Sequence, residues 1–451
     1  MALFKSIVIT FWKFLLRRGP KSGLVVGLAV RDDQTTRRQV TLPQHLRSEH
    51  IAILGKTGTG KSSLLRYFMS QDIRAGLGFV CIDLHGDLIP FVLATIAERE
   101  QKNGEDLSHR LLLIDPSDPK YSVGLNLLEP QDHQSPTVLI SEMVSFLKHK
   151  WNLDHFGART EELLRNSLWV LSENGLTLLE ISPLLVDPTY RRTLLQKVAN
   201  QEVKRFFEDR YNQASQAMQS VMREAVLNKV TAFTVDPAIR HIVGQQKSSI
   251  SLRTAIDQGF WILLDLRKGR LGENASTFAG LFLSKLKGAI FGRAHRNLFT
   301  VYADELPNLV ATDDAFLTLL SEARKFAVSI VSANQFLNQF TRAMKSALFS
   351  VGTALCFQLS AEDAPFMARV LAGEKTLARR LITLDHRHLI GKFGEFTSEV
   401  LVPSVRKPQV SFSSLTQRSL QRFGKSREQI EEEINARKPA TTTEKGLDDW
   451  D

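Results

Sequence analysis

The residues with the clearest chemistry form a glycine-rich stretch, GKTGTGKS, at positions 55–62. Its spacing matches G-x-x-x-x-G-K-[ST], in which glycines let the backbone curl so that successive N–H groups point at phosphate oxygens. Lys61 adds a positive charge that reaches the β- and γ-phosphates, and the Ser62 hydroxyl is suited to bind Mg²⁺. The motif therefore predicts a P-loop that binds ATP with Mg²⁺. The predicted nucleotide-binding residues are Gly55, Lys56, Thr57, Gly58, Thr59, Gly60, Lys61, Ser62 and Ser63.

A P-loop needs a second, acidic site for the metal and the attacking water, and the run FTVYADE at 299–305 offers one. Asp304 would complete the Mg²⁺ shell with Ser62, and Glu305 would polarise the water. The simpler alternative is that these two carboxylates only cap the turn that follows. Asp265, at the end of the run WILLD, competes for the metal role, but Leu and Arg follow it rather than Glu.

Gln335 stands just past the next apolar run, in the sequence SANQ. The carboxyl ends of neighbouring strands in a parallel sheet gather over one crevice. We therefore expect Gln335 to lie near the γ-phosphate, where it can report hydrolysis to the rest of the protein. The alternative is an ordinary glutamine at the start of a helix.

Apolar runs alternate with helical segments around these motifs. Runs that are apolar throughout indicate strands of a parallel sheet covered on both faces. The sequence therefore predicts an α/β fold of the RecA-like P-loop NTPase type, with a mainly parallel central sheet. The predicted strands are Val25–Val30, Val40–Leu42, His50–Leu54, Gly78–Asp83, Arg110–Asp115, Trp261–Asp265, Phe299–Asp304, Ala327–Ala333, Val351–Phe357, Arg387–Lys392 and Phe396–Leu401.

The pattern changes between residues 136 and 235, where leucines recur at the three- and four-residue spacing of amphipathic helices. This predicts an all-helical domain inserted into the α/β domain. Ser426 and Gln429 have the spacing of a capping box, which predicts a short charged helix. The predicted division is 1–20 as a basic-apolar N-terminal helix, 21–135 as the first part of the NTPase domain, 136–250 as the all-α insertion, 251–405 as the second part of the NTPase domain, and 406–451 as linker, charged helix and disordered tail.

The formal net charge of the 451-residue chain is +10, and residues 1–50 hold nine lysines and arginines against three acidic residues. Such a charge favours a polyanionic partner, either nucleic acid or an anionic membrane surface, although +10 is modest for this length. Cys81 and Cys356 lie in apolar runs and are expected to be buried thiols in a reducing cytoplasm. Lys5 and Lys13 interrupt the apolar start of the chain, so it is too short to span a membrane. It either lies at a membrane interface or packs on protein.

Three longer motifs together resemble a known family. They are VCIDLHGDL at 80–88, YADELPN at 302–308 and LLSEARKFAVSIVSANQ at 319–335, all following the P-loop. The combination is similar to the coupling proteins of conjugative type IV secretion and to the wider FtsK/HerA class of hexameric DNA-pumping ATPases. The resemblance covers roughly residues 45–405, including the helical insertion.

The resemblance implies roles for individual residues. Lys61 and Ser62 match the phosphate and magnesium residues, and Asp304 with Glu305 match the second acidic motif. Gln335 matches the γ-phosphate sensor. Arg324 matches an arginine finger that acts on the nucleotide of a neighbouring subunit, with Lys325 as the second candidate. His85 is either part of the nucleotide site or an ordinary loop histidine.

The resemblance also implies a function: an ATP-driven DNA translocase that forms a ring, expected to be a hexamer, and binds single- or double-stranded DNA without sequence preference. A relaxase, a nuclease or a secretion-channel protein would be its partner. The chain differs from coupling proteins in lacking two N-terminal membrane helices, so we expect it in the cytoplasm, with membrane contact through residues 1–18 left open. The alternatives are a nucleotide-gated adaptor that recruits protein cargo or a nuclease, and a secretion or pilus ATPase that acts on protein.

Overall fold

The computed structural model describes residues 23–130, 135–150, 157–309, 313–372 and 375–438. The predicted basic-apolar N-terminal helix and the final tail lie outside these residues. Among the helices that are described, none has the length and apolar content needed to cross a membrane.

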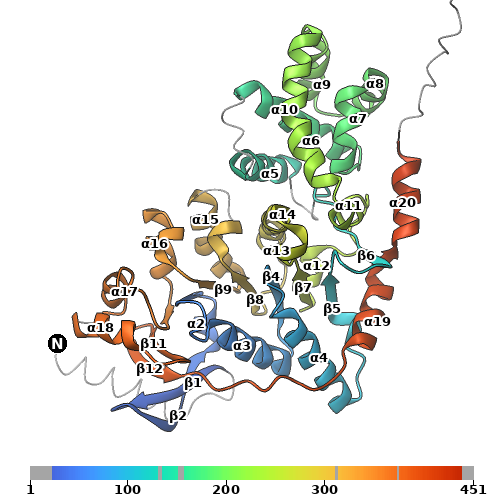
Figure 1. Cartoon of the computed structure of the whole chain (residues 1–451). Coiled ribbons are helices and arrows are strands. Elements are labelled where there is room, and N and C mark those ends of the chain that lie inside the picture. The colour runs from blue at the N-terminus through green and yellow to red at the C-terminus, as the bar shows by residue number, and fades with distance from the viewer. Residues whose placement is uncertain (1–22, 131–134, 151–156, 310–312, 373–374, 439–451) are drawn as a thin grey trace, which may run out of the picture. The chain divides into compact units, whose positions relative to one another are not determined.

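The chain divides into two compact units (Figure 1). Unit 1 contains the residues up to Asp115 together with Ile250–Phe423, and unit 2 contains Pro116–Pro130, the segment that ends at Ser249, and the residues from Gly424. The elements of unit 1 are β1 Gly23–Arg31, β2 Gln34–Pro43, α2 Gln44–Arg47, β3 Ile51–Leu54, α3 Lys61–Ala75, β4 Gly78–Asp83, α4 Ile89–Asn103, η1 Ser108–Arg110, β5 Leu111–Ile114, α12 Leu252–Asp257, β7 Trp261–Asp265, α13 Lys268–Leu271, α14 Glu273–Phe291, β8 Phe299–Asp304, η5 Leu306–Leu309, α15 Asp313–Ala323, η6 Arg324–Phe326, β9 Val328–Asn334, η7 Leu337–Gln339, α16 Arg342–Phe349, β10 Thr353–Cys356, α17 Ala364–Val370, α18 Lys375–Thr383, β11 His388–Phe393, β12 Phe396–Leu401 and α19 Ser413–Phe423.

One 11-stranded sheet forms the centre of unit 1, in the order β2-β1-β12-β11-β10-β3-β9-β8-β4-β7-β5. The strands from β10 to β5 pair in parallel, and the four at the other end pair antiparallel. The predicted α/β class with a mainly parallel sheet is therefore confirmed. The order places β9 between β3 and β8, so the strands that precede the P-loop, Gln335 and Glu305 are consecutive neighbours.

Both faces of the parallel strands are covered, which explains why their sequences are apolar throughout. Every residue of β4, β7 and β9 is buried. Alternate strand residues such as Ile51, Ile53 and Cys81 share one core cluster with residues of α3 and α4. Helices α14 and α15 lie on the other side of the sheet (Figure 1).

A buried charge pair fastens the P-loop helix to the sheet. Arg47, at the end of α2, makes a bidentate contact with Asp72 of α3, at 2.7 and 2.8 Å. The Tyr302 hydroxyl of β8 donates to the same carboxylate at 2.6 Å, and Arg47 also donates to Thr300 of β8. Because both charges are almost fully buried, each depends on the other for compensation.

Unit 2 is mainly helical, with one small two-stranded sheet. Several of its helices begin at polar caps: the Asp187 and Asp236 side chains accept backbone N–H groups ahead of α8 and α11, and proline follows each cap. Its elements are β6 Tyr121–Val123, α5 Pro136–Lys150, α6 Ala158–Glu173, η3 Leu178–Glu180, α7 Ile181–Val186, α8 Pro188–Gln196, α9 Gln201–Arg205, the π-helical turn η4 Phe206–Tyr211, α10 Gln216–Thr234, α11 Pro237–Val243, β13 Gly424–Ser426 and α20 Arg427–Ala436.

The boundaries of unit 2 differ from the sequence-based division. Unit 2 begins at Pro116 rather than 136, because Gly124 and Asn126 hydrogen-bond to the serines at 248 and 249. The segment 406–451, predicted as a linker, a charged helix and a disordered tail outside both domains, is divided between the units at Phe423, and Ser413–Phe423 forms the additional helix α19. The Ser426–Gln429 capping box is present at the start of α20, as predicted.

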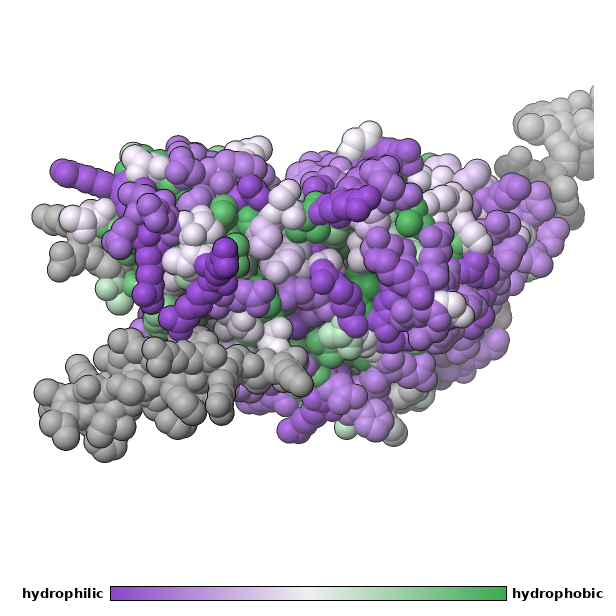
Figure 2. Space-filling model, turned by 90° about the horizontal axis from the view of Figure 1, so that it is seen from below, coloured by the Kyte–Doolittle hydropathy of each residue, from purple (hydrophilic) through white to green (hydrophobic). Residues whose placement is uncertain are grey.

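The face of the molecule seen in Figure 2 is mostly hydrophilic, and its hydrophobic areas are small and separate. Among the described residues visible on that face, no extended apolar patch of the kind that marks a large docking surface is seen.

Candidate functional site

The loop between β3 and α3 has the backbone that a phosphate cradle requires. Gly58 and Gly60 have φ of 77° and 122°, which disfavour any residue with a Cβ. Gly55 is needed for space, because a Cβ there would lie 2.6 Å from the Cβ of Phe357. The loop leads directly into α3, so the N–H groups and positive dipole end of that helix face the same point.

Lys61 is the first residue of α3, and its ammonium group turns back to the carbonyls of this loop. Its Nζ donates to the carbonyl oxygens of Gly55 and Lys56, at 2.5 and 2.9 Å. Burial lowers the pKa of Lys61, and the nearby carboxylates of Asp304 and Glu305 oppose that shift. The lysine and the acidic pair are therefore close enough to interact electrostatically, which a shared site requires.

The acidic pair ends strand β8. Burial raises the pKa of Asp304 to about 6, with Glu305 and Asp87 adding to the rise and His85 and Lys61 opposing it. Glu305 has φ of 56°, a strained conformation for a residue with a side chain. Its backbone N–H donates to Ala333 of β9 at 2.8 Å, which fixes the turn.

Gln335 connects the P-loop to the acidic pair. Its amide oxygen accepts a hydrogen bond from the Thr57 hydroxyl at 3.0 Å, and its amide nitrogen donates to Glu305 Oε1 at 3.2 Å. Lys268 Nζ lies 3.9 Å from the other oxygen of Glu305. The sequence placed Gln335 near the γ-phosphate but did not predict its hydrogen bond with Thr57, 278 positions away.

The other aspartates at strand ends have structural partners. Asp83 accepts four backbone N–H groups, from His85, Gly86, Leu88 and Ile89, so it holds the loop that leads into α4. Both oxygens of Asp265 contact the Arg267 guanidinium, at 2.8 and 2.5 Å. His85 Nε2 lies 3.9 Å from Asp304 Oδ2, within range of a weak ion pair. The lower rank given to Asp265 as a metal ligand is consistent with its pairing to arginine.

The donor set fits a magnesium ion bound together with a nucleotide. Within the described parts of the chain, no group of three or more His, Cys, Asp or Glu side chains is arranged to hold a metal by itself. Ser62 and Asp304 would supply one hydroxyl and one carboxylate, and Mg²⁺ at such sites takes most of its remaining ligands from phosphates and water. The site would therefore bind the metal as part of a metal–nucleotide complex.

Arg387 contacts the P-loop, and the sequence motifs did not predict this contact. Its backbone N–H donates to the Thr59 carbonyl at 2.9 Å, and it adopts a positive φ of 66°. A Cβ on Gly60 would lie 3.2 Å from the Arg387 Cα. Only the folding of β11 back onto β10 brings this residue to the loop, and the sequence carries no local signal for that.

Arg324 is not brought to the P-loop of its own chain. It precedes β9, whereas Gln335 follows it, so the two lie at opposite ends of a seven-residue strand, roughly 20 Å apart. Arg324 Nη2 instead lies 2.9 Å from Glu49 Oε1, just ahead of β3. Lys325 pairs with Glu322 on the same helix. Neither cation can therefore serve the phosphate site of its own chain in this arrangement.

A family model described as the central domain of the helicase HerA matches residues 26–258, which is more than half of the chain. That match contains the P-loop and ends before Asp304. No curated protein matches the sequence.

Solved structures of a coupling protein and of VirB4 are similar to this chain over most of its length. The bacterial conjugative coupling protein TrwB, lacking its N-terminal segment, is 16% identical, with a TM-score of 0.59 over 89% of this chain and 94% of that one. VirB4 of Thermoanaerobacter pseudethanolicus is 15% identical, with a TM-score of 0.58 over 86% of this chain and 98% of that one. TrwB structures hold a GTP analogue, an ATP analogue, and ADP with Mg²⁺. These similarities establish the RecA-like P-loop NTPase fold.

Proposed function

The chain belongs to the family of the HerA helicase central domain, and on that premise we propose that it is an ATP-hydrolysing motor that moves DNA. The observation that carries the proposal is the hydrogen-bonded chain from Thr57 through Gln335 to Glu305. It joins the phosphate loop, a polar sensor and an acidic group in one site, as phosphoryl transfer to water requires.

Each residue of this site has a separate role in ATP hydrolysis. The P-loop N–H groups and Lys61 bind the phosphates, and Ser62 with Asp304 hold Mg²⁺, which neutralises charge on the phosphate oxygens. Glu305 accepts a proton from the attacking water. Gln335 contacts both the loop and Glu305, so a change at the γ-phosphate is transmitted to β9.

The site is completed by a neighbouring subunit. Hydrolysis spreads negative charge over the transferring phosphoryl group, and a rigid guanidinium stabilises that charge well. Arg324 cannot reach the phosphates of its own chain, but an identical subunit placed head to tail would present it. We therefore assign Arg324 as the arginine finger and a ring, expected to be a hexamer, as the active assembly.

DNA is the proposed substrate of the motor for two reasons. The family is named for a helicase, and the chain carries a net charge of +10. Contacts of lysine and arginine with phosphates would bind single- or double-stranded DNA without sequence preference and with strong salt dependence. The fold shared with a conjugative coupling protein supports work in conjugation or secretion with a relaxase, a nuclease or a channel protein. The two buried, free cysteines suit the cytoplasm.

The test is ATP hydrolysis by the purified full chain with and without DNA. Single-stranded and double-stranded DNA are tested separately. We expect at least one of them to stimulate hydrolysis. Lys61→Ala should abolish it, and Lys102→Ala, which removes an exposed charge on α4, should leave it unchanged. Arg324→Ala should keep ATP binding and lose hydrolysis.

Three outcomes would redirect the proposal. Hydrolysis that ignores DNA but responds to a protein partner would favour the adaptor or the secretion ATPase. Of these two alternatives, binding of a cargo protein by the helical unit would favour the adaptor. Normal turnover in Arg324→Ala would remove the finger assignment.

A further inference from the structure

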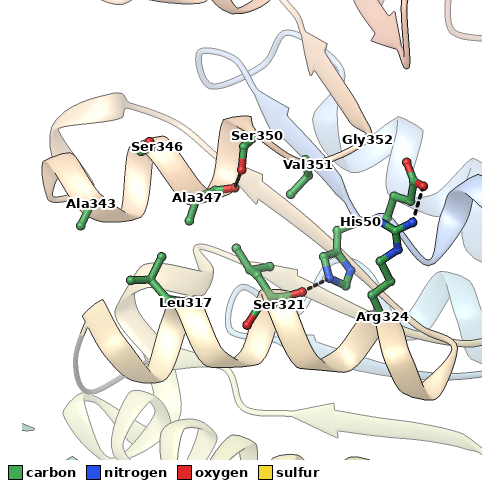
Figure 3. A pocket seen from close by; sticks show the side chains of 12 residues that line it. His50, Leu317, Ser321, Arg324, Ala343, Ser346, Ala347, Ser350, Val351 and Gly352 are labelled. Carbon is green, nitrogen blue, oxygen red and sulfur yellow. Dashed lines mark hydrogen bonds and ion pairs between the residues drawn. The ribbon is translucent and has the colours of Figure 1, made fainter.

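Arg324 pairs with Glu49, and packing and hydrogen bonds restrict the position of Glu49 more than is usual for a surface ion pair. Arg324 lies at the rim of the α15–α16 groove, a cavity of about 690 Å³ lined by residues that include Glu49, His50, Leu320, Arg324, Ala347 and Gly352 (Figure 3). The groove opens at the amino-terminal ends of β3 and β9, whereas the P-loop lies at the carboxyl-terminal ends of the same parallel strands. If Arg324 acts on the nucleotide of a neighbouring subunit, as proposed above, that nucleotide must approach this rim.

Gly352 contacts both the backbone and the side chain of Glu49 and restricts its position. The Gly352 backbone N–H donates to the Glu49 carbonyl at 3.0 Å. A Cβ on Gly352 would lie 2.5 Å from Glu49 Oε2 and 2.6 Å from its Cβ. Gly352 does not have a positive φ, so glycine is required at this position for space and not for backbone conformation. Because Gly352 has no side chain, the Glu49 carboxylate can occupy the space next to it.

His50 fixes the two segments that carry the pair. Its Nε2 lies 2.5 Å from the carbonyl of Leu320, three residues before α15 ends, and its Nδ1 accepts the Ile330 N–H of β9 at 3.1 Å. Burial lowers the pKa of His50 to about 4, so the ring is neutral and Nε2 carries the proton that Leu320 accepts. The ring joins α15 and β9 directly beside Glu49.

We propose that Glu49 is a positioning residue that orients Arg324 toward the phosphates of a neighbouring subunit. The contact joins Oε1 to Nη2, which leaves the remaining N–H donors of the guanidinium fork for a phosphate. The Arg324 side chain is 61% exposed and that of Glu49 only 26%, so the carboxylate is the fixed partner and the arginine the one that reaches outward. The inference rests on the proposed trans role of Arg324.

The test uses two substitutions that act on the carboxylate in different ways. Glu49→Gln keeps the shape and removes the charge, and Gly352→Ala keeps the charge and displaces the carboxylate. Each should lower the kcat of ATP hydrolysis by about fivefold, the factor that corresponds to about 1 kcal/mol for a partly exposed ion pair. The KM for ATP should change little, because the P-loop of the same chain is untouched.

Two controls separate positioning from general damage. Glu322→Gln removes the matched partner of Lys325 one turn away and should leave kcat unchanged. Arg324→Ala should retain only slow residual hydrolysis, which is measurable at high enzyme concentration. In that background Glu49→Gln should lower the residual rate no further, because it acts only through the arginine. A loss of kcat in Glu322→Gln with none in Glu49→Gln would transfer the role to Lys325 and overturn the inference.

The outcomes also distinguish this inference from the proposed function. If Arg324→Ala hydrolyses ATP normally, the trans finger itself is wrong. If Arg324→Ala is inactive while Glu49→Gln keeps or exceeds the original kcat, the finger stands and Glu49 does not position it. An equal loss from Glu49→Gln with and without Arg324 would likewise contradict the inference.

Discussion

Replacing Asp304 with asparagine should stabilise the protein while it removes ATP hydrolysis. Burial raises the pKa of this carboxyl group from 3.8 to about 6, so the folded chain holds the proton more tightly than the unfolded chain. The stabilising contribution of the protonated group is complete below 3.8 and is lost as the pH rises through about 6. Above that pH, the ionised carboxylate costs the fold about 3 kcal/mol, a cost that asparagine avoids.

The measurement is thermal unfolding of the full chain without nucleotide or Mg²⁺. At about pH 7.5, Asp304→Asn should raise the unfolding midpoint of unit 1 by roughly 5 °C. The gain should shrink toward about pH 5, where the original carboxyl group is protonated. Asp87→Asn, which removes an exposed charge on the adjacent loop, should change stability by no more than about 0.5 kcal/mol. A variant that is no more stable at the higher pH, or whose gain is independent of pH, would refute the reasoning.

Three further predictions follow from the same contacts. Asp72→Ala should lower the free energy of unfolding by about 3–5 kcal/mol in urea, because it leaves the Arg47 guanidinium buried and unpaired; a loss under about 1 kcal/mol would contradict this. Gln335→Ala should lower the kcat for ATP by about tenfold or more while ATP affinity, measured by calorimetry, stays close to the original value, because the residue links Glu305 to the loop without holding the phosphates; an unchanged kcat would exclude the sensor role. Gly60→Ala should weaken ATP binding, because it places a Cβ at φ 122° and 3.1 Å from the Phe357 ring; Gly104→Ala, at a positive φ but in open space, is the control that should bind ATP normally.

Much of the site could be predicted from short segments of sequence. The P-loop is encoded within eight residues, because its backbone needs glycines at fixed positions and its lysine and serine follow at once. The apolar runs located the parallel strands, since a strand buried on both faces has no polar positions. Asp304 and Glu305 were chosen as the acidic pair at the end of an apolar run, and Gln335 was placed near the γ-phosphate by the rule that parallel strands end together. In the structure Gln335 contacts both Thr57 of the P-loop and Glu305.

The remaining features needed contacts between distant segments. The sequence did not indicate that Asp83 is occupied by four backbone N–H groups, or that Arg387 lies against the P-loop. The helical pattern likewise could not assign residues 116–130 to unit 2 or divide the C-terminal segment between the two units.

The sequence by itself determined the local chemistry: a phosphate loop, two acidic residues after one strand, a glutamine after another and an arginine before it. Only the tertiary structure decided which of these share a site, because strand order depends on packing between segments hundreds of residues apart. The placement of β9 between β3 and β8 joins Gln335 to both motifs. Arg324 lies just before the same strand, at its amino-terminal end and beside Glu49, away from the P-loop of its own chain.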